Sequence, residues 1–189
     1  MIIVILILSI IFVSYFGYWN ARGMSSFYTD RPMMISHRGV TSIYPENTIE
    51  AYINSVEVGY NCIELDVLSS LDGEIYCSHN HELEKETSSR GYIHKMESTE
   101  LDDIKTGSYS HPENQKKIPR LDNVIKKLPN SIRLNIEIKF SNPFDFSTIN
   151  QLRKKIRKKK IKQPILISSF NPFIVFYARW FIPNVKIGY

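Results

Sequence analysis

Ionisable side chains recur at four points in the sequence, each inside or just after a short apolar run. The four groups are Ser36-His37-Arg38-Gly39, Glu64-Leu65-Asp66, His79 and Glu137-Ile138-Lys139. Side chains alternate between the two faces of a strand, so residues two apart share a face. If the apolar runs form neighbouring strands, three carboxylates and a lysine meet in one place.

Carboxylates that share one cleft repel each other unless a cation or a proton neutralises them. A set made only of hard oxygen donors suits Mg²⁺ or Ca²⁺ better than a soft metal. We therefore predict a divalent metal site on Glu64, Asp66 and Glu137.

Two histidines, His37 and His79, flank this predicted metal site. Histidine is the side chain best suited to proton transfer near neutral pH. Arg38 follows His37 directly, and a guanidinium group can bind two phosphate oxygens at once. A metal, an acid–base pair and an anion-binding arginine together indicate hydrolysis of a phosphate ester.

Short apolar segments that alternate with amphipathic ones must position these groups. Six strands are expected at 32–36, 62–68, 74–78, 133–140, 165–168 and 185–189. Helices are expected between them at 48–58, 121–128, 148–160 and 173–180. This alternation predicts an α/β fold with parallel pairing, in which active-site residues gather at the carboxyl ends of the strands.

The motifs resemble, in order and spacing, the glycerophosphodiester phosphodiesterase family over about residues 33–189. The resemblance rests on the four groups above and on Pro45-Glu46-Asn47-Thr48, Ile118-Pro119 with Leu121, Asn135-Ile136 and Ser169-Phe170. It implies a TIM-type (β/α)₈ barrel. It also implies metal-dependent hydrolysis of glycerophosphodiesters, such as glycerophosphocholine, to an alcohol and glycerol phosphate.

The resemblance also implies a role for each matching residue. His37 and His79 would be the general acid and base, and Glu64, Asp66 and Glu137 the metal ligands. Arg38 and Lys139 would hold the phosphate, while Glu46 and Asn47 would support the site after the first strand.

Two positions near the second histidine bear on its role. Asn80 stands where the family usually has aspartate, which leaves the orientation and basicity of His79 open. His81 is a further imidazole that could share the role of His79.

A complete (β/α)₈ barrel runs to about 250 residues, so we expect domain 32–189 to lack the last two strands. Two interpretations follow. In one, the chain is an active phosphodiesterase that needs those strands or a partner supplying them. In the other, it is a catalytically inactive fragment that serves at most as a membrane-tethered binding module.

Residues 1–19 contain no charged side chain and are almost entirely apolar. A membrane-spanning helix needs roughly 20 such residues. No Lys or Arg precedes the run, which favours a retained anchor over a cleaved signal peptide. We expect a single-pass transmembrane helix at 1–19, a linker at 20–31 and membrane localisation, with Arg22 and Arg31 weakly favouring a cytoplasmic domain.

The excess of basic residues is local. Eight of them lie between Arg153 and Lys162, and without them the formal net charge falls from +5 to −3. We therefore expect no nucleic-acid partner. The run fits the solvent face of an outer barrel helix, or a contact with an anionic membrane surface. The two cysteines, Cys62 and Cys77, are expected to be buried thiols in the core.

Overall fold

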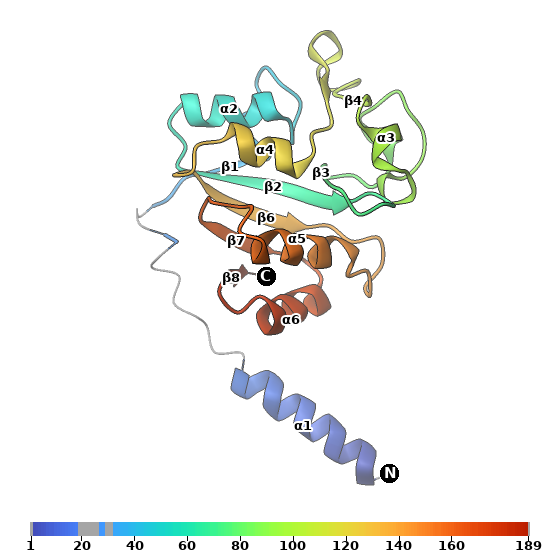
Figure 1. Cartoon of the computed structure of the whole chain (residues 1–189), viewed down its shortest axis with the longest axis vertical. Helices are drawn as coiled ribbons and strands as arrows, with labels where there is room; N and C mark the ends of the chain where they lie inside the picture. The colour runs from blue at the N-terminus through green and yellow to red at the C-terminus, as the bar shows by residue number, and fades with distance from the viewer. Residues whose placement is uncertain (1, 19–26, 29–31, 189) are drawn as a thin grey trace.

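The computed structural model of the chain describes residues 2–18, 27–28 and 32–188 (Figure 1). The strands are β1 (Ile35–His37), β2 (Cys62–Ser69), β3 (Ile75–Cys77), β4 (Lys105–Thr106), β5 (Lys116–Lys117), β6 (Arg133–Ile138), β7 (Ile165–Ser168) and β8 (Lys186–Gly188). The α-helices are α1 (Ile2–Tyr18), α2 (Ile49–Glu57), α3 (Ser98–Leu101), α4 (Leu121–Lys127), α5 (Ser147–Arg157) and α6 (Pro172–Phe181). Three short 3₁₀ helices complete the described part: η1 (Leu83–Lys85), η2 (Ile93–Lys95) and η3 (Pro112–Asn114).

The main sheet has six strands, five of which follow the order β1-β2-β6-β7-β8, and all the pairs along this path are parallel. Helices α2, α4, α5 and α6 lie along one side of the sheet (Figure 1). Each parallel connection here contains a helix, as a crossover between parallel strands requires. The expectation of a parallel α/β fold with helices between the strands is confirmed.

The third predicted strand does not join this parallel order. Strand β3 pairs with the end of β2 in the antiparallel direction, with Val67 opposite Cys77. The segment joining them is a tight turn in which Gly73 has a φ of +85°. A connection this short can join only antiparallel strands. Of the six strands predicted to be parallel, β3 is therefore antiparallel, because the Asp72-Gly73 turn reverses the chain directly after β2.

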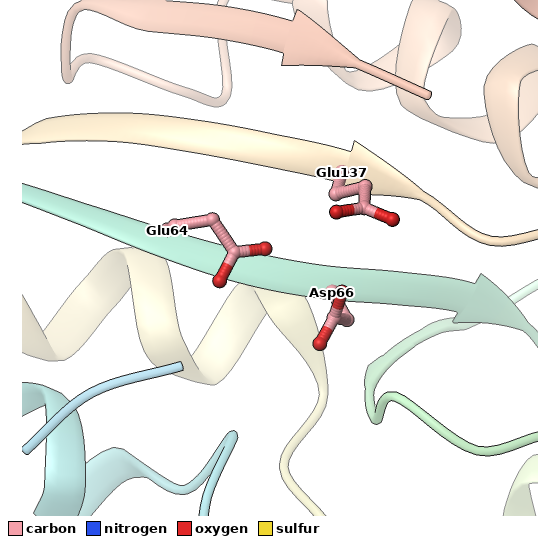
Figure 2. Close-up of side chains that lie close together, drawn as sticks. All are labelled: Glu64, Asp66 and Glu137. Atoms are coloured by element: carbon pink, nitrogen blue, oxygen red, sulfur yellow. The ribbon is translucent and has the colours of Figure 1, made fainter. Parts of the chain in front are cut away.

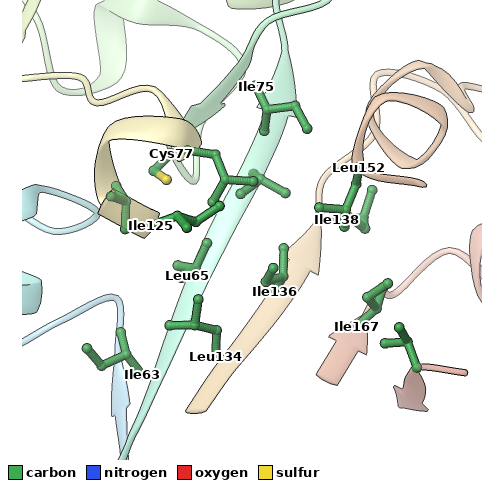
Figure 3. Close-up of a cluster of buried hydrophobic side chains, with 14 of the residues drawn as sticks. Ile63, Leu65, Ile75, Cys77, Ile125, Leu134, Ile136, Ile138, Leu152 and Ile167 are labelled. Atoms are coloured by element: carbon green, nitrogen blue, oxygen red, sulfur yellow. The ribbon is translucent and has the colours of Figure 1, made fainter. Parts of the chain in front are cut away.

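Alternation along the strands separates an apolar face from a polar one. In β6, Leu134, Ile136 and Ile138 are buried, and Asn135 and Glu137 point to the opposite face. The apolar side chains of β2, β6 and β7 meet those of the covering helices in one core (Figure 3). Burial of this face fixes the strand register and so fixes what stands on the other face.

The segment between β3 and α4 holds more structure than its polar composition suggests. It contains η1, η2, α3, η3 and the antiparallel pair β4–β5. A second small core, formed by Leu68, Tyr76, Leu83, Ile93, Leu101 and Ile118, holds it against the end of β2. These apolar residues are irregularly spaced, so no periodic pattern predicts the structure of this segment.

The transmembrane anchor predicted at 1–19 is not supported. Helix α1 has 17 residues, or about 26 Å at 1.5 Å per residue, whereas a bilayer core is about 30 Å thick. Among the described residues no helix combines the length and the apolar character needed to cross a membrane. The prediction of a single-pass membrane anchor is therefore wrong, and the membrane partner and the orientation predicted from that anchor have no support.

Most of the predicted linker 20–31 lies outside the described residues. Phe27 and Tyr28 are described, and Phe27 is buried against Cys62 and Leu166. Both cysteines are free and buried, as expected.

Candidate active site

The three predicted metal ligands lie together on the polar face of the sheet. Glu64 and Asp66 project from β2, and Glu137 projects from the neighbouring β6 (Figure 2). One ligand atom from each lies within 4.8 Å of the other two. Asp66 and Glu137 are direct register partners across the two strands, so the parallel pairing itself sets their separation.

Burial makes this cluster electrostatically costly. The side chains of Glu64 and Asp66 are only 7% and 0% exposed. Burial, followed by the nearby Asp66 carboxylate, raises the pKa of Glu64 to about 8. Without a further cation, Glu64 therefore keeps its proton at neutral pH.

One oxygen of Glu64 is available to a ligand. The backbone N–H of Arg38 donates to Oε2 at 3.0 Å. Oε1 is buried and accepts no hydrogen bond within the described structure. A buried acceptor without a donor, inside a group of three carboxylates, fits a small divalent cation.

Two basic side chains from different elements contact the same carboxylates. Lys139 Nζ lies 2.9 Å from Asp66 Oδ1 and also bonds Glu137. Arg38 Nε lies 3.1 Å from Asp66 Oδ2, and its Nη1 bonds Glu46. Asp66 therefore has a positive charge on each of its two oxygens.

The loop after β1 brings Arg38 into the site by adopting a left-handed turn. Arg38 has a φ of 58° and the next residue, Gly39, has 89°. A Cβ at Gly39 would lie 2.7 Å from the Cβ of Ala51 in α2. Glycine is required there because only its absent side chain allows α2 to approach so closely.

Asn47 links this loop to β2. Its Nδ2 donates to Asp66 Oδ2 at 2.9 Å, and its Oδ1 accepts from the Asp66 backbone N–H at 3.1 Å. Oδ1 also accepts from the hydroxyl of Tyr52 at 2.7 Å. The sequence analysis missed Tyr52, since an aromatic residue at helical spacing indicates core packing.

The two predicted proton-transfer residues occupy different surroundings. His37 ends β1, is 70% exposed in its side chain, and has Nε2 at 3.9 Å from Glu64 Oε2. His79 follows β3 and lines a small cavity with Glu46 and Asn47. The structure therefore places one histidine beside the carboxylates and the other beside the Glu46-Asn47 pair.

Asn80 contacts His79, whereas His81 contacts His94. Asn80 Oδ1 is 3.3 Å from His79 Nδ1. His81 instead packs edge-on against His94, with ring centroids 5.6 Å apart. Burial, followed by the charge of His94, lowers the pKa of His81.

Comparisons with known proteins identify the family of this chain. The model of the glycerophosphoryl diester phosphodiesterase family matches residues 37–187. A glycerophosphodiester phosphodiesterase of Caldanaerobacter subterraneus subsp. tengcongensis is 28% identical over 160 residues, which cover 84% of this chain and 66% of that protein.

Two solved structures share the fold. A phosphodiesterase of Oleispira antarctica, solved with the product sn-glycerol-3-phosphate, is 31% identical with a TM-score of 0.76, and the match covers 84% of this chain and 65% of that one. A glycerophosphodiester phosphodiesterase of Agrobacterium tumefaciens is 26% identical with a TM-score of 0.68, covering 82% and 65%. The chain thus spans about two thirds of the length of these relatives. With the family match running from the end of β1 into β8, the chain belongs to the glycerophosphoryl diester phosphodiesterase family.

Proposed function

We propose that this chain hydrolyses glycerophosphodiesters to an alcohol and glycerol phosphate, using a divalent cation, Mg²⁺ or Ca²⁺. The observation that carries the proposal is the buried group of Glu64, Asp66 and Glu137 with an unpartnered oxygen on Glu64. Family membership and the glycerol phosphate bound to the Oleispira relative support the choice of substrate.

In this proposal Glu64, Asp66 and Glu137 hold the cation. When bound, it would supply positive charge to a phosphate oxygen and to the charge that develops during hydrolysis. The all-oxygen donor set and the raised pKa of Glu64 support a cation here, because burial and the neighbouring carboxylate disfavour the charged form of Glu64 and a cation would offset both.

Arg38 and Lys139 bind the phosphate of the substrate. Both cations already lie within 3.1 Å of Asp66, and their side chains are 20% and 14% exposed. Partly buried cations hold an anion more strongly than exposed ones, since solvent screens them less. Glu46 orients Arg38 through the Nη1 contact at 3.0 Å.

His37 and His79 move the protons. Attack by water on phosphorus forms one P–O bond, and the bond to the alcohol oxygen breaks. One histidine takes the proton from the water, and the other gives a proton to the departing alkoxide. The Asn80 side chain contacts His79 Nδ1 at 3.3 Å, so His79 would exchange its proton through Nε2.

The test is hydrolysis of sn-glycero-3-phosphocholine by the purified full chain, followed by measurement of glycerol 3-phosphate. We expect EDTA to abolish activity, and Mg²⁺ or Ca²⁺ to restore it. Activity that is indifferent to EDTA would remove the metal from the proposal. Binding of Mg²⁺ without release of glycerol 3-phosphate would contradict the proposed hydrolysis.

A further inference from the structure

The hydroxyl group of Tyr52 extends from the apolar core to Asn47, beside the candidate metal site. It lies in α2 and is fully buried, with its ring in the main hydrophobic cluster. Its hydroxyl donates to Asn47 Oδ1 at 2.7 Å. A buried tyrosine whose hydroxyl has a defined partner contributes geometry as well as apolar area.

Asn47 links the Tyr52 hydroxyl to Asp66 through hydrogen bonds. Its amide oxygen accepts from the Tyr52 hydroxyl and the Asp66 backbone N–H, and its amide nitrogen donates to Asp66 Oδ2. Because two donors converge on the oxygen, the amide cannot rotate by half a turn without placing its N–H₂ group against them. The oxygen of the side chain thus faces Tyr52, and the nitrogen faces the carboxylate.

The state of Tyr52 suits the role of donor. Burial, followed by the nearby Cys77, raises the pKa of its hydroxyl well above the ordinary value, which favours the protonated, donating form. Cys77 is itself fully buried and free. No solvent reaches this end of the network to replace the hydroxyl.

We propose that Tyr52 is a positioning residue of the metal site: its hydroxyl fixes the Asn47 amide, which holds Asp66 Oδ2 and leaves Oδ1 on the side of Lys139 and Glu137. This inference rests on the metal site of the proposed function. It extends that site to a residue that touches neither the metal nor the substrate. Groups that orient a ligand in this way typically change metal affinity 10- to 100-fold.

The test removes the hydroxyl alone, with Tyr52→Phe in the full chain. Tyr76→Phe is the matched control, because Tyr76 is also fully buried and its hydroxyl bonds Ser98 and Asp102, which lie outside the carboxylate group. We expect calorimetric titration with Mg²⁺ to show roughly tenfold weaker binding for Tyr52→Phe, and no comparable change for Tyr76→Phe.

Two results of this titration would overturn the proposal. One is wild-type affinity in Tyr52→Phe. The other is an equal loss in Tyr76→Phe, which would make the effect a general consequence of removing a buried hydroxyl. If Tyr52→Phe does not fold while Tyr76→Phe does, the hydroxyl serves stability and the proposal also fails.

A second measurement separates this proposal from the metal itself. The side-chain amide signals of Asn47 in ¹H–¹⁵N spectra of the metal-free chain can be identified by their loss in Asn47→Asp. We expect these signals to shift and to exchange faster with solvent in Tyr52→Phe but not in Tyr76→Phe. If the wild-type chain binds neither Mg²⁺ nor Ca²⁺, the metal site fails, and these signals alone decide whether Tyr52 positions Asn47. Unchanged Asn47 signals in Tyr52→Phe would refute it.

Discussion

Lys139 Nζ lies 2.9 Å from Asp66 Oδ1, so the residue that follows β6 forms an ion pair with a side chain of β2 inside the carboxylate group. The ammonium group also bonds Glu137 of β6. Lys139 thus supplies charge where a divalent cation is proposed to bind, and it competes for the same oxygens.

Replacing Lys139 with methionine should separate these two effects. Lys139→Met removes the competing charge, so we expect Mg²⁺ to bind several-fold more tightly in calorimetric titration. The same variant loses a phosphate contact, so hydrolysis of glycerophosphocholine should fall. Lys116→Met, at a lysine of β5 distant in sequence from the carboxylates, should change neither quantity. Weaker Mg²⁺ binding in Lys139→Met would contradict this assignment.

Glu137→Gln should cripple metal binding without unfolding the domain. The amide keeps the size of the side chain and removes its charge, and Glu137 lies on the polar face rather than in the core. We expect the dissociation constant for Mg²⁺ to rise by more than the roughly 10- to 100-fold seen for supporting residues. Thermal unfolding should remain cooperative. Glu113→Gln, at an exposed residue of η3, is the control for loss of a carboxylate.

His37→Ala and His79→Ala should each lower the rate of hydrolysis by roughly 10²- to 10⁴-fold, the usual size of a general acid–base contribution. His81→Ala should have a much smaller effect, because His81 packs against His94 rather than beside the carboxylates. Steady-state rates of the three variants decide the assignment. If His81→Ala proves as damaging as His79→Ala, the second histidine has been chosen wrongly.

The raised pKa of Glu64 predicts how stability depends on pH in the metal-free chain. In the folded state the pKa of Glu64 is about 8, whereas its ordinary value is 4.5. Proton binding by Glu64 therefore stabilises the folded state fully at pH values below the pKa of Glu64 in the unfolded chain. This stabilisation is lost as the pH rises through the pKa of Glu64 in the folded chain. Urea unfolding in EDTA should give a lower free energy of unfolding at pH 8 than at pH 5.

The control for this pH effect is Glu64→Gln, which cannot titrate. Its free energy of unfolding should vary less between pH 5 and pH 8 than that of the wild type. Between these two pH values, Mg²⁺ should raise the stability of the wild type more at pH 8, where a smaller fraction of the carboxyl carries a proton. A wild-type chain that is more stable at pH 8 than at pH 5 and matches Glu64→Gln in slope would show that Glu64 titrates normally.

The sequence predicted the parallel strands and the carboxylate group well, because both follow from alternation. In 133–138 apolar and polar residues alternate strictly, so Glu137 had to face away from Ile136 and Ile138. The same reasoning placed Glu64 and Asp66 on one face of β2. The face that each side chain occupies and the pairing of neighbouring strands were enough to predict that the three carboxylates lie together.

The parts that sequence reasoning missed depend on contacts between distant residues. The hydroxyl of Tyr52 reaches Asn47 only because α2 packs closely over Gly39. The direction of β3 could have been predicted from the Asp72-Gly73 turn, because a connection this short joins only antiparallel strands. The membrane anchor was predicted from composition alone, and no helix among the described residues is long and apolar enough to cross a membrane.

The pairing of β2 with β6 gives the core and the carboxylate group a common register. Leu65 stands beside Ile136 on one face, and Asp66 stands beside Glu137 on the other. A slip of β6 by one residue would turn Ile136 and Ile138 out of the core and send Glu137 into it, because the side-chain period of a strand is two. A one-residue slip would therefore separate the three carboxylates and also expose core side chains to water. Packing of the core thus favours the register that assembles the acidic group, even before any ligand binds.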